Sequence, residues 1–279
     1  MIRYPGGKTK LKKHIIPIIQ SSYEDNNQLY IEPFLGAGSI ASSIIEISSF
    51  NHYLLNDKDL GIICIWKSII ENIDTLISEI NKIVPSVEAF YTIKQKLSNN
   101  NDFLLQNFSI VEIAVMKIAI HQFSYSGLGL KAGGPIGGKN QKSSYSVGCR
   151  WNPKNIIKNI QKINKILSKK NITSDDIQNK DFEYVLSFGE NYNSFYYLDP
   201  PYYEQGNSLY ICGFLEKDHI RLQEILKKSK NKWLLSYDNN PYIKTLYEWA
   251  NIKEISMKCT INGANSKIEL LISNFDYQI

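Results

Sequence analysis

The tetrapeptide Asp199-Pro200-Pro201-Tyr202 carries the strongest chemical signal in the chain. It follows the short apolar run Phe195–Leu198, which predicts a buried strand. Because proline has no backbone N–H, the two prolines end that strand and leave a rigid turn beside the Asp199 carboxylate. Ligands of open α/β sheets bind at the carboxyl ends of strands. A carboxylate, a carbonyl and an aromatic ring at that place suit the binding of a planar amine.

A glycine turn near the N-terminus is a second candidate site. Gly36-Ala37-Gly38 lies between a predicted strand, Leu29–Ile31, and a predicted helix, Ser39–Ile47. Glycine lets a ligand approach the backbone, although a tight strand–helix connection alone also explains the turn, and the spacing differs from the dinucleotide fingerprint. The next predicted strand, His52–Leu55, closes at Asp57. A carboxylate there can accept both hydroxyls of a ribose, although a solvated turn residue is the simpler alternative.

Two other glycine-rich segments do not form a phosphate-binding P-loop. Tyr4–Thr9 has Ile2 where the motif needs its first glycine, and Gly133–Lys139 is followed by Asn140 instead of Ser or Thr. We therefore do not expect an ATPase.

The middle of the chain is predicted to be helical. Apolar residues at spacings of three and four line one helical face, and further helices are expected at Ser86–Leu97, Ser109–Phe123 and Asn155–Ser168. Ser109–Phe123 is apolar almost all round, which predicts that it is buried. The stretch Gly127–Gly148 is rich in Gly, Lys and Ser, and loops of that length are usually functional or mobile. The apolar face consists of Ile62, Trp66, Ile69, Ile73, Leu76, Ile80 and Ile83.

The remainder is predicted to alternate strands and helices. A helix is expected at Lys12–Gln20, and later helices at Glu216–Lys228 and Pro241–Trp249. The later strands are Phe195–Leu198, Lys232–Ser236, Ile252–Met257 and Ile268–Ser273. The chain is therefore expected to be an α/β protein that is interrupted by a mainly helical insertion at about residues 60–170.

Composition sets limits on function. The 279 residues are 43% hydrophobic and carry a formal charge of +5, which favours a polyanionic partner but equally fits a basic soluble enzyme. Four scattered cysteines and four histidines argue against a metal site. We find no signal peptide and no run of about 18 apolar residues, so a cytoplasmic protein without membrane association is expected. The only arginines are Arg3, Arg150 and Arg221.

Taken together, these motifs resemble the Dam-like, D12-class adenine-N6 DNA methyltransferases over almost the whole chain. The resemblance implies an α/β, Rossmann-like S-adenosylmethionine-dependent methyltransferase sheet in a catalytic domain made of residues 1–60 and 170–279. It also implies a mainly helical target-recognition (DNA-binding) domain at 61–169. The motifs that carry it are Tyr4–Lys8, Glu32–Ser39, Asn56-Asp57, Tyr125–Leu128, Asp199–Tyr202 and Glu269–Ser273.

The resemblance further implies S-adenosylmethionine as cofactor, S-adenosylhomocysteine as product, and no metal. The implied cofactor-binding residues are Tyr4, Lys8, Phe34, Gly36, Ala37, Gly38, Ser39, Asp57, Asp181, Phe182 and Asp199. Asp175 and Asp176 are alternative candidates for the role given to Asp181, which is to lie beside the adenine of the cofactor. The implied catalytic residues are Asp199, Pro200, Pro201 and Tyr202.

These residues imply a mechanism at the amine. Asp199 and the Pro200 carbonyl would accept hydrogen bonds from adenine N6, and Tyr202 would stack on the base after it leaves the duplex. The expected partner is double-stranded DNA, and the protein is expected to be a monomer or weak dimer. Three settings stay open from the sequence: a restriction system with a cognate endonuclease, a phage-borne enzyme and a solitary regulator.

The expected DNA contacts lie in one segment. Arg150 is placed to read a guanine edge, and the lysines suit phosphates. Family members that read GATC have Asn where this chain has Ser126, so the resemblance does not extend to GATC specificity. The expected DNA-binding residues are Tyr125, Ser126, Lys131, Lys139, Lys142 and Arg150.

Three alternatives stay open from the sequence. The first is the same fold acting on RNA adenine or on cytosine N4. The second is a protein-glutamine methyltransferase, although such enzymes usually carry Asn at the position of Asp199. The third is an inert DNA-binding module that retains the fold. Motif order and the large insertion favour adenine in DNA.

Overall fold

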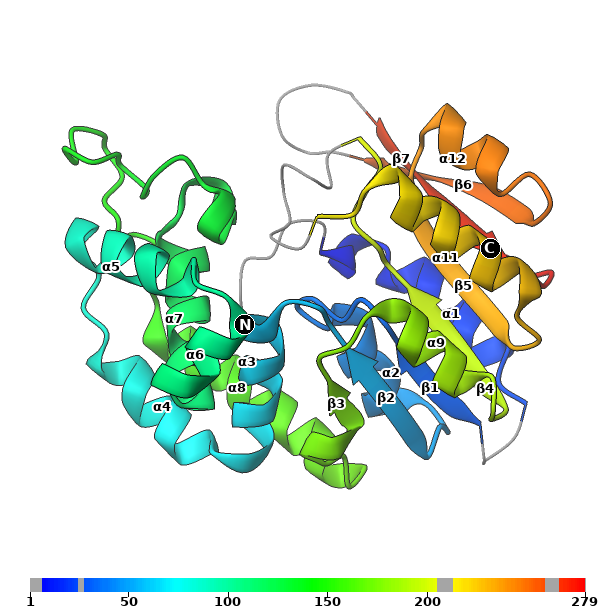
Figure 1. Cartoon of the computed structure of the whole chain (residues 1–279), viewed down its shortest axis with the longest axis horizontal. Coiled ribbons are helices and arrows are strands. Elements are labelled where there is room, and N and C mark those ends of the chain that lie inside the picture. Colours follow the sequence, from blue (N-terminus) through cyan, green and yellow to red (C-terminus); the bar gives the residue numbers. More distant parts are fainter. Residues whose placement is uncertain (1–6, 25–27, 205–212, 259–265, 279) are drawn as a thin grey trace. The chain divides into compact units, whose positions relative to one another are not determined.

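The computed structural model describes residues 7–24, 28–204, 213–258 and 266–278 (Figure 1). Backbone contacts divide the chain into two units. Residues 59–179 make up most of one, called here the helical unit. Residues 8–58, 180–208 and 212–279 make up the other, called the sheet unit.

The sheet has seven strands in the described part of the chain, in the order β3-β2-β1-β4-β5-β7-β6. β1 pairs in parallel with β2 and β4, and β4 pairs in parallel with β5. β7 lies antiparallel between β5 and β6. This sheet confirms the predicted α/β class. The strands are β1 Leu29–Glu32, β2 His52–Asn56, β3 Ile177–Gln178, β4 Ser194–Leu198, β5 Lys232–Asp238, β6 Asn251–Lys258 and β7 Ser266–Ser273.

The strand order reverses between β1 and β4. β1 is followed in the chain by β2 on one side, whereas β4 and β5 continue on the other side. Every residue of β1 and β4 is buried, as expected for central strands that helices cover on both faces. Ligands of such sheets bind beyond the strand ends at the point of reversal, which here follows Glu32 and Leu198.

Helices cover the two faces of the sheet. α1 (Lys12–Ser21) packs against α2 (Ser39–Ile47), and α9 (Phe182–Gly189) packs against α11 (Glu216–Lys228) on the opposite face (Figure 1). The short α12, Pro241–Leu246, precedes β6. The bounds of α11 are those that the sequence predicts.

The helical unit is centred on α7, Ile110–Phe123, which packs against α3, α4 and α5. Twelve of its 14 residues are buried, which confirms the prediction from its apolar composition. A capping box between Ser109 and Glu112 starts it. The other helices are α3 Leu60–Glu71, α4 Ile73–Lys82, α5 Val87–Leu97, α6 Asn101–Asn107 and α8 Pro153–Lys169.

A charged pair lies inside this unit. Lys117 of α7 is 2% exposed and donates to the Asp59 carboxylate over 2.6 Å. Burial raises the pKa of Asp59, but the Lys117 ammonium outweighs it and the net pKa lies below the usual range.

Two predicted elements differ from the structure, and two observed helices have no predicted counterpart. The apolar face from Ile62 to Ile83 does not belong to one helix, because Asn72 (φ −136°, ψ 37°) leaves the helical conformation and separates α3 from α4. α12 ends at Leu246 instead of Trp249, since Tyr247 also leaves that conformation. Helices α6 and α9 were not predicted.

No single helix in the described ranges is long and apolar enough to cross a membrane. Only α6 and α7 taken together reach that length and composition, across a bend of 119°.

Candidate active site

Lys8 connects three acidic or phenolic groups at the strand ends of the sheet unit. Its Nζ donates to Asp199 Oδ1 and, over 2.8 Å, to the Tyr202 hydroxyl. It also lies 3.3 Å from Glu269 Oε1 on β7, and the Tyr202 hydroxyl donates to that carboxylate. Lys8 is 4% exposed and Glu269 is fully buried. One ammonium therefore holds two carboxylates and the tyrosine in fixed positions.

Asp199 remains the accessible member of this group. Its side chain is 22% exposed, whereas the Lys8 side chain is 3% exposed. A carboxylate has about four lone-pair sites, so a bond from Lys8 leaves capacity for a donor from a substrate. Asp199 and Tyr202 are expected together at the end of β4, and Lys8 contacts both of them. The sequence predicts Lys8 only as a cofactor-binding residue.

Glu32 adds a second buried carboxyl at the end of β1. It accepts a 2.8 Å hydrogen bond from the Tyr30 hydroxyl and is 2% exposed. Burial raises the pKa of Glu32 well above its usual range; the Tyr30 bond opposes this, and the charge of Asp199 adds to it. Its environment therefore favours the uncharged carboxylic acid.

The glycine turn contacts Asp57. The Gly36 amide donates to Asp57 Oδ2 over 2.7 Å, and the Leu35 amide donates to the Asn56 carbonyl over 2.8 Å. Gly36 (φ 49°) and Gly38 (φ 61°) are both in the left-handed region, which a side chain would strain. Gly38 begins α2 without a side-chain cap, and its own amide donates to the Leu35 carbonyl over 2.7 Å.

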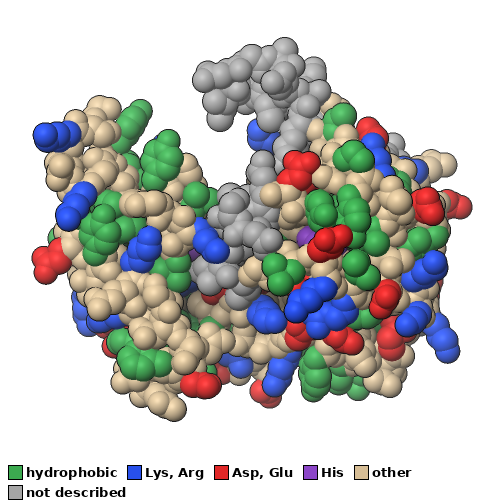
Figure 2. All heavy atoms as spheres, turned by 45° about the horizontal axis from the view of Figure 1, so that its top comes forward, with side chains coloured by type: hydrophobic (Ala, Val, Ile, Leu, Met, Phe, Trp, Pro, Cys, Tyr) green, Lys and Arg blue, Asp and Glu red, His purple; other side chains and the backbone are tan. Residues whose placement is uncertain are grey.

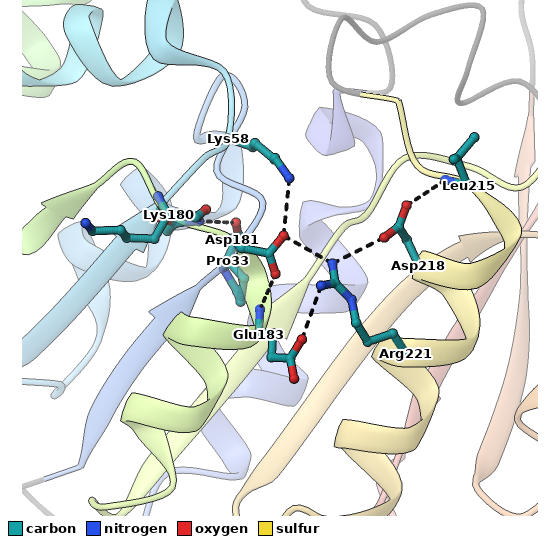
Figure 3. Close-up of polar contacts among 9 residues, drawn as sticks. Pro33, Lys58, Lys180, Asp181, Glu183, Leu215, Asp218 and Arg221 are labelled. Atoms are coloured by element: carbon teal, nitrogen blue, oxygen red, sulfur yellow. Dashed lines mark hydrogen bonds and ion pairs between the residues drawn. The ribbon is translucent and has the colours of Figure 1, made fainter. Parts of the chain in front are cut away.

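Asp181 lies in a cluster of charged groups at the start of α9 (Figure 3). It caps the helix by accepting from the Glu183 amide over 3.0 Å, and it pairs with Lys58 at 3.2 Å and Arg221 at 3.1 Å. Arg221 also reaches Glu183 and Asp218, each at 3.2 Å. Burial raises the pKa of Asp181, but the hydrogen bonds and the two cations lower it below its usual range.

An aromatic group lies beside Asp181. The rings of Phe34, Phe182 and Phe214 are 5.5 to 5.7 Å apart, and the Arg221 guanidinium covers Phe182 at 4.3 Å. Arg221 therefore packs on Phe182 and binds Asp181 at once. The competing residue Asp176 is engaged elsewhere, since it accepts from the Thr173 amide over 2.8 Å.

The predicted DNA-contact residues are all exposed on a structured loop of the helical unit. Tyr125, Ser126, Lys131, Lys139, Lys142 and Arg150 are the residues in question. Two side chains at the end of α7 contact the backbone of the loop. His121 Nδ1 lies 2.8 Å from the Gly127 carbonyl, and Ser124 Oγ accepts from the Gly129 amide over 2.9 Å. Gln141 donates to the Ile136 carbonyl and accepts from the Val147 amide, each over 2.8 Å.

The sequence did not point to several of these residues as part of a site. The fold brings Glu269, Glu32, Arg221 and Gln141 to their partners. Glu32 and Glu269 lie in motifs of the sequence, whereas Arg221 and Gln141 had no such signal. The predicted residue Tyr4 lies outside the described residues. Phe34 and Phe182 meet in the aromatic group, Gly36 and Asp57 meet in the turn, and Ala37 and Ser39 flank Gly38 there. Within the described residues, no group of three or more His, Cys, Asp or Glu side chains could hold a metal ion.

Comparison with known proteins agrees with this geometry. The family described as D12 class N6 adenine-specific DNA methyltransferase matches residues 4–261. The Type II methyltransferase M.MjaIII of Methanocaldococcus jannaschii is 25% identical over 98% of both chains. The Type II methyltransferase M1.LlaDCHI of Lactococcus lactis subsp. cremoris is 25% identical over 98% of this chain and 94% of its own. M.CviBI, from Paramecium bursaria Chlorella virus NC1A, is 33% identical over 28% of this chain.

The sheet and its strand-end site thus define a Rossmann-like methyltransferase fold. The chain belongs to the D12 class of N6 adenine-specific DNA methyltransferases. The resemblance that its motifs predicted is confirmed.

Proposed function

We propose that this protein transfers a methyl group from S-adenosylmethionine to adenine N6 in double-stranded DNA, after the adenine leaves the helix. The observation that carries the proposal is the position of Asp199, partly exposed at the end of β4 and bonded to the buried Lys8. Base flipping follows from geometry, because N6 cannot be reached inside a duplex.

The residues of the sheet unit fit the cofactor. Asp57, next to the Gly36–Gly38 turn, suits the hydroxyls of a ribose, and the Phe34–Phe182–Phe214 group suits the face of an adenine. Asp181 offers an acceptor beside these rings. Bound there, the cofactor supplies a sulfonium methyl group that an amine can attack.

Asp199 would activate the amine by position and charge. The lone pair of adenine N6 is delocalised into the ring, and hydrogen bonds from its two N–H groups to Asp199 and the Pro200 carbonyl localise it. The N6 lone pair forms the new C–N bond, the sulfur keeps the electrons of the broken C–S bond, and N6 releases one proton to solvent or to Asp199. Lys8 fixes the carboxylate for this task. Stacking of the base on Tyr202 remains a prediction; in this structure that side chain is 5% exposed.

The helical unit is proposed to recognise the DNA target. Tyr125 would fill the space that the flipped base leaves in the duplex, Ser126 would also contact the DNA, and Arg150 would read a guanine. Lys131, Lys139 and Lys142 would contact phosphates. A restriction endonuclease as partner, and a monomer or weak dimer as the oligomeric state, also remain proposals.

Replacement of the acceptor tests the proposal. We expect Asp199→Ala to lower transfer of labelled methyl groups to DNA by about a hundredfold or more, because an oriented electrostatic contact to the reacting group is lost. DNA binding, measured by mobility shift, should change little. Transfer at a near-normal rate in a folded Asp199→Ala protein would refute the assignment.

A further inference from the structure

Helix α8 carries five lysines along one face: Lys154, Lys158, Lys162, Lys165 and Lys169, called here the lysine stripe. Their spacings of four, four, three and four place them above one another on a helix. All five are exposed. The helix has no acidic residue, and none occurs anywhere between Glu112 and Asp175.

The opposite face of α8 is part of the core. Ile156, Ile160 and Leu167 are at most 3% exposed, and the helix packs against α3 and α4. Asn164 donates to the Ile69 carbonyl of α3 over 2.7 Å. Because its apolar face is already buried, α8 cannot insert that face into a membrane surface.

The stripe opposes helix stability. Like charges four residues apart on a helix repel each other, and natural helices usually offset this with Glu at the same spacing. In the part of the chain that the structure describes, Lys154, Lys158, Lys165 and Lys169 form no ion pair with an acidic side chain. A polyanion would offset this repulsion.

The distribution of charge along the chain also favours a polyanionic partner for the helical unit. The helical unit, residues 59–179, has 15 basic and 9 acidic residues, a net charge of +6, whereas the whole chain has a net charge of +5. The rest of the chain is therefore slightly acidic. On the face that Figure 2 shows, blue side chains predominate over the helical unit, while blue and red mix over the sheet unit.

The stripe begins beside the proposed recognition loop. The Trp151 ring packs edge-on against Phe123 at 5.4 Å, and Phe123 is the last residue of α7 before that loop. Asn152 then caps α8 by accepting from the Asn155 amide over 3.0 Å. These contacts fix the start of the stripe next to the segment that holds Tyr125.

We propose that the lysine stripe binds the phosphates of duplex DNA beside the target sequence, and so extends the DNA contact beyond the loop. The inference rests on the proposed function. From Lys154 to Lys169 the helix rises about 22 Å, which corresponds to roughly six base pairs. Lysine supplies point charges without base recognition, so the stripe contributes affinity and orientation, not specificity.

The test is the salt dependence of DNA binding without cofactor. The variant carries three neutral substitutions within the stripe: Lys158→Gln, Lys165→Gln and Lys169→Gln. Dissociation constants for a duplex of about 24 base pairs are measured between about 50 and 200 mM salt. Each lost phosphate contact lowers the slope of log affinity against log salt by about 0.9, so we expect a slope shallower by about 2 to 3.

A matched control removes the same charge elsewhere. Three exposed lysines of the sheet unit are replaced for this purpose: Lys13→Gln, Lys228→Gln and Lys230→Gln. The control should keep the wild-type slope. The stripe variant should melt at the wild-type temperature or above, because glutamine is a good helix former and removes repulsion.

Equal slopes for the stripe and control variants would overturn the inference. So would a variant that loses binding to single-stranded RNA but keeps its binding to duplex DNA, since the stripe would then serve another polyanion. A wild-type protein that does not bind duplex DNA would refute the proposed function as well. Normal wild-type binding with an unchanged variant slope would refute the stripe alone.

Discussion

At the scale of single residues, the site depends on one buried cation. Lys8 is hydrogen-bonded to Asp199 and Tyr202, which follow β4, and ion-paired with Glu269 on β7. Buried charges are tolerated when they are paired and hydrogen-bonded, and removal of one partner leaves the others uncompensated. The same lysine therefore contributes to stability and to the orientation of the proposed catalytic carboxylate.

This arrangement predicts a large loss of stability in Lys8→Met. The free energy of unfolding, from urea denaturation, should fall by about 3 to 5 kcal/mol, because Glu269 is left charged without its cation. Adding Glu269→Gln should restore part of that loss. The exposed neighbour Lys10 is the control, and Lys10→Met should stay within about 0.5 kcal/mol of wild type. A Lys8→Met protein as stable as Lys10→Met would contradict this account of the site.

At the scale of elements, Arg221 joins two helices across the proposed cofactor site. From α11 it reaches Asp181 and Glu183 at the start of α9, and it covers the Phe182 ring. A guanidinium is planar, with five N–H donors in a fixed fork, and it stacks flat on a ring, whereas an ammonium is a compact point charge. Arg221 is thus a positioning residue for Asp181 and Phe182.

We expect Arg221→Lys to weaken S-adenosylhomocysteine binding roughly tenfold, measured by titration calorimetry. The side chains of Arg221 and Asp181 are 35% and 31% exposed, and solvent screening limits the effect. Arg221→Met should weaken it further. Lys228→Met, at the other end of α11, serves as the control. An unchanged dissociation constant in both Arg221 variants would show that the cluster does not position the site.

Elements with a clear period and a chemical end signal were predictable from the sequence. The two prolines end β4 at Leu198, and the predicted bounds of α11 match the structure. The break at Asn72 was missed because the apolar spacing continues through it, and only the backbone angles reveal it. Glu269 and Arg221 were missed as site residues because their partners lie far away in sequence, 67 residues in the case of Tyr202 and Glu269. Local patterns do not encode such pairs.

At the scale of the whole molecule, His219 couples folding to pH. It is 1% exposed, and its Nδ1 lies 2.6 Å from the Tyr237 hydroxyl. Burial lowers the pKa of His219 to about 4. The unfolded chain, with an ordinary histidine pKa of about 6.5, then binds more protons between these two values, so stability falls as the pH falls through this range.

The measurement is the free energy of unfolding of wild type and His219→Gln between about pH 4.5 and 6.5. As the pH falls, the free energy of unfolding should decrease more steeply for the wild type than for the variant. The two slopes should differ by at most the slope that one bound proton gives. Glu32, whose pKa is raised, acts in the opposite direction in both proteins and cancels in the difference. Parallel pH profiles for the two proteins would contradict the buried, neutral state of His219.

The two units divide the proposed task. The sheet unit holds the strand-end site with Asp199, and the helical unit carries the net positive charge and the exposed loop. We propose that the sheet unit methylates the exocyclic amine of adenine, and cytosine N4 is the alternative target that has to be excluded.

The most direct test identifies the methylated nucleoside. Unmodified duplex DNA is incubated with the protein and S-adenosylmethionine, digested, and analysed by mass spectrometry. We expect N6-methyldeoxyadenosine with the wild-type protein and about a hundredfold less, or none, with Asp199→Ala. N4-methyldeoxycytidine as the product, or no methylated nucleoside from a folded wild-type protein that binds both cofactor and DNA, would contradict the proposal.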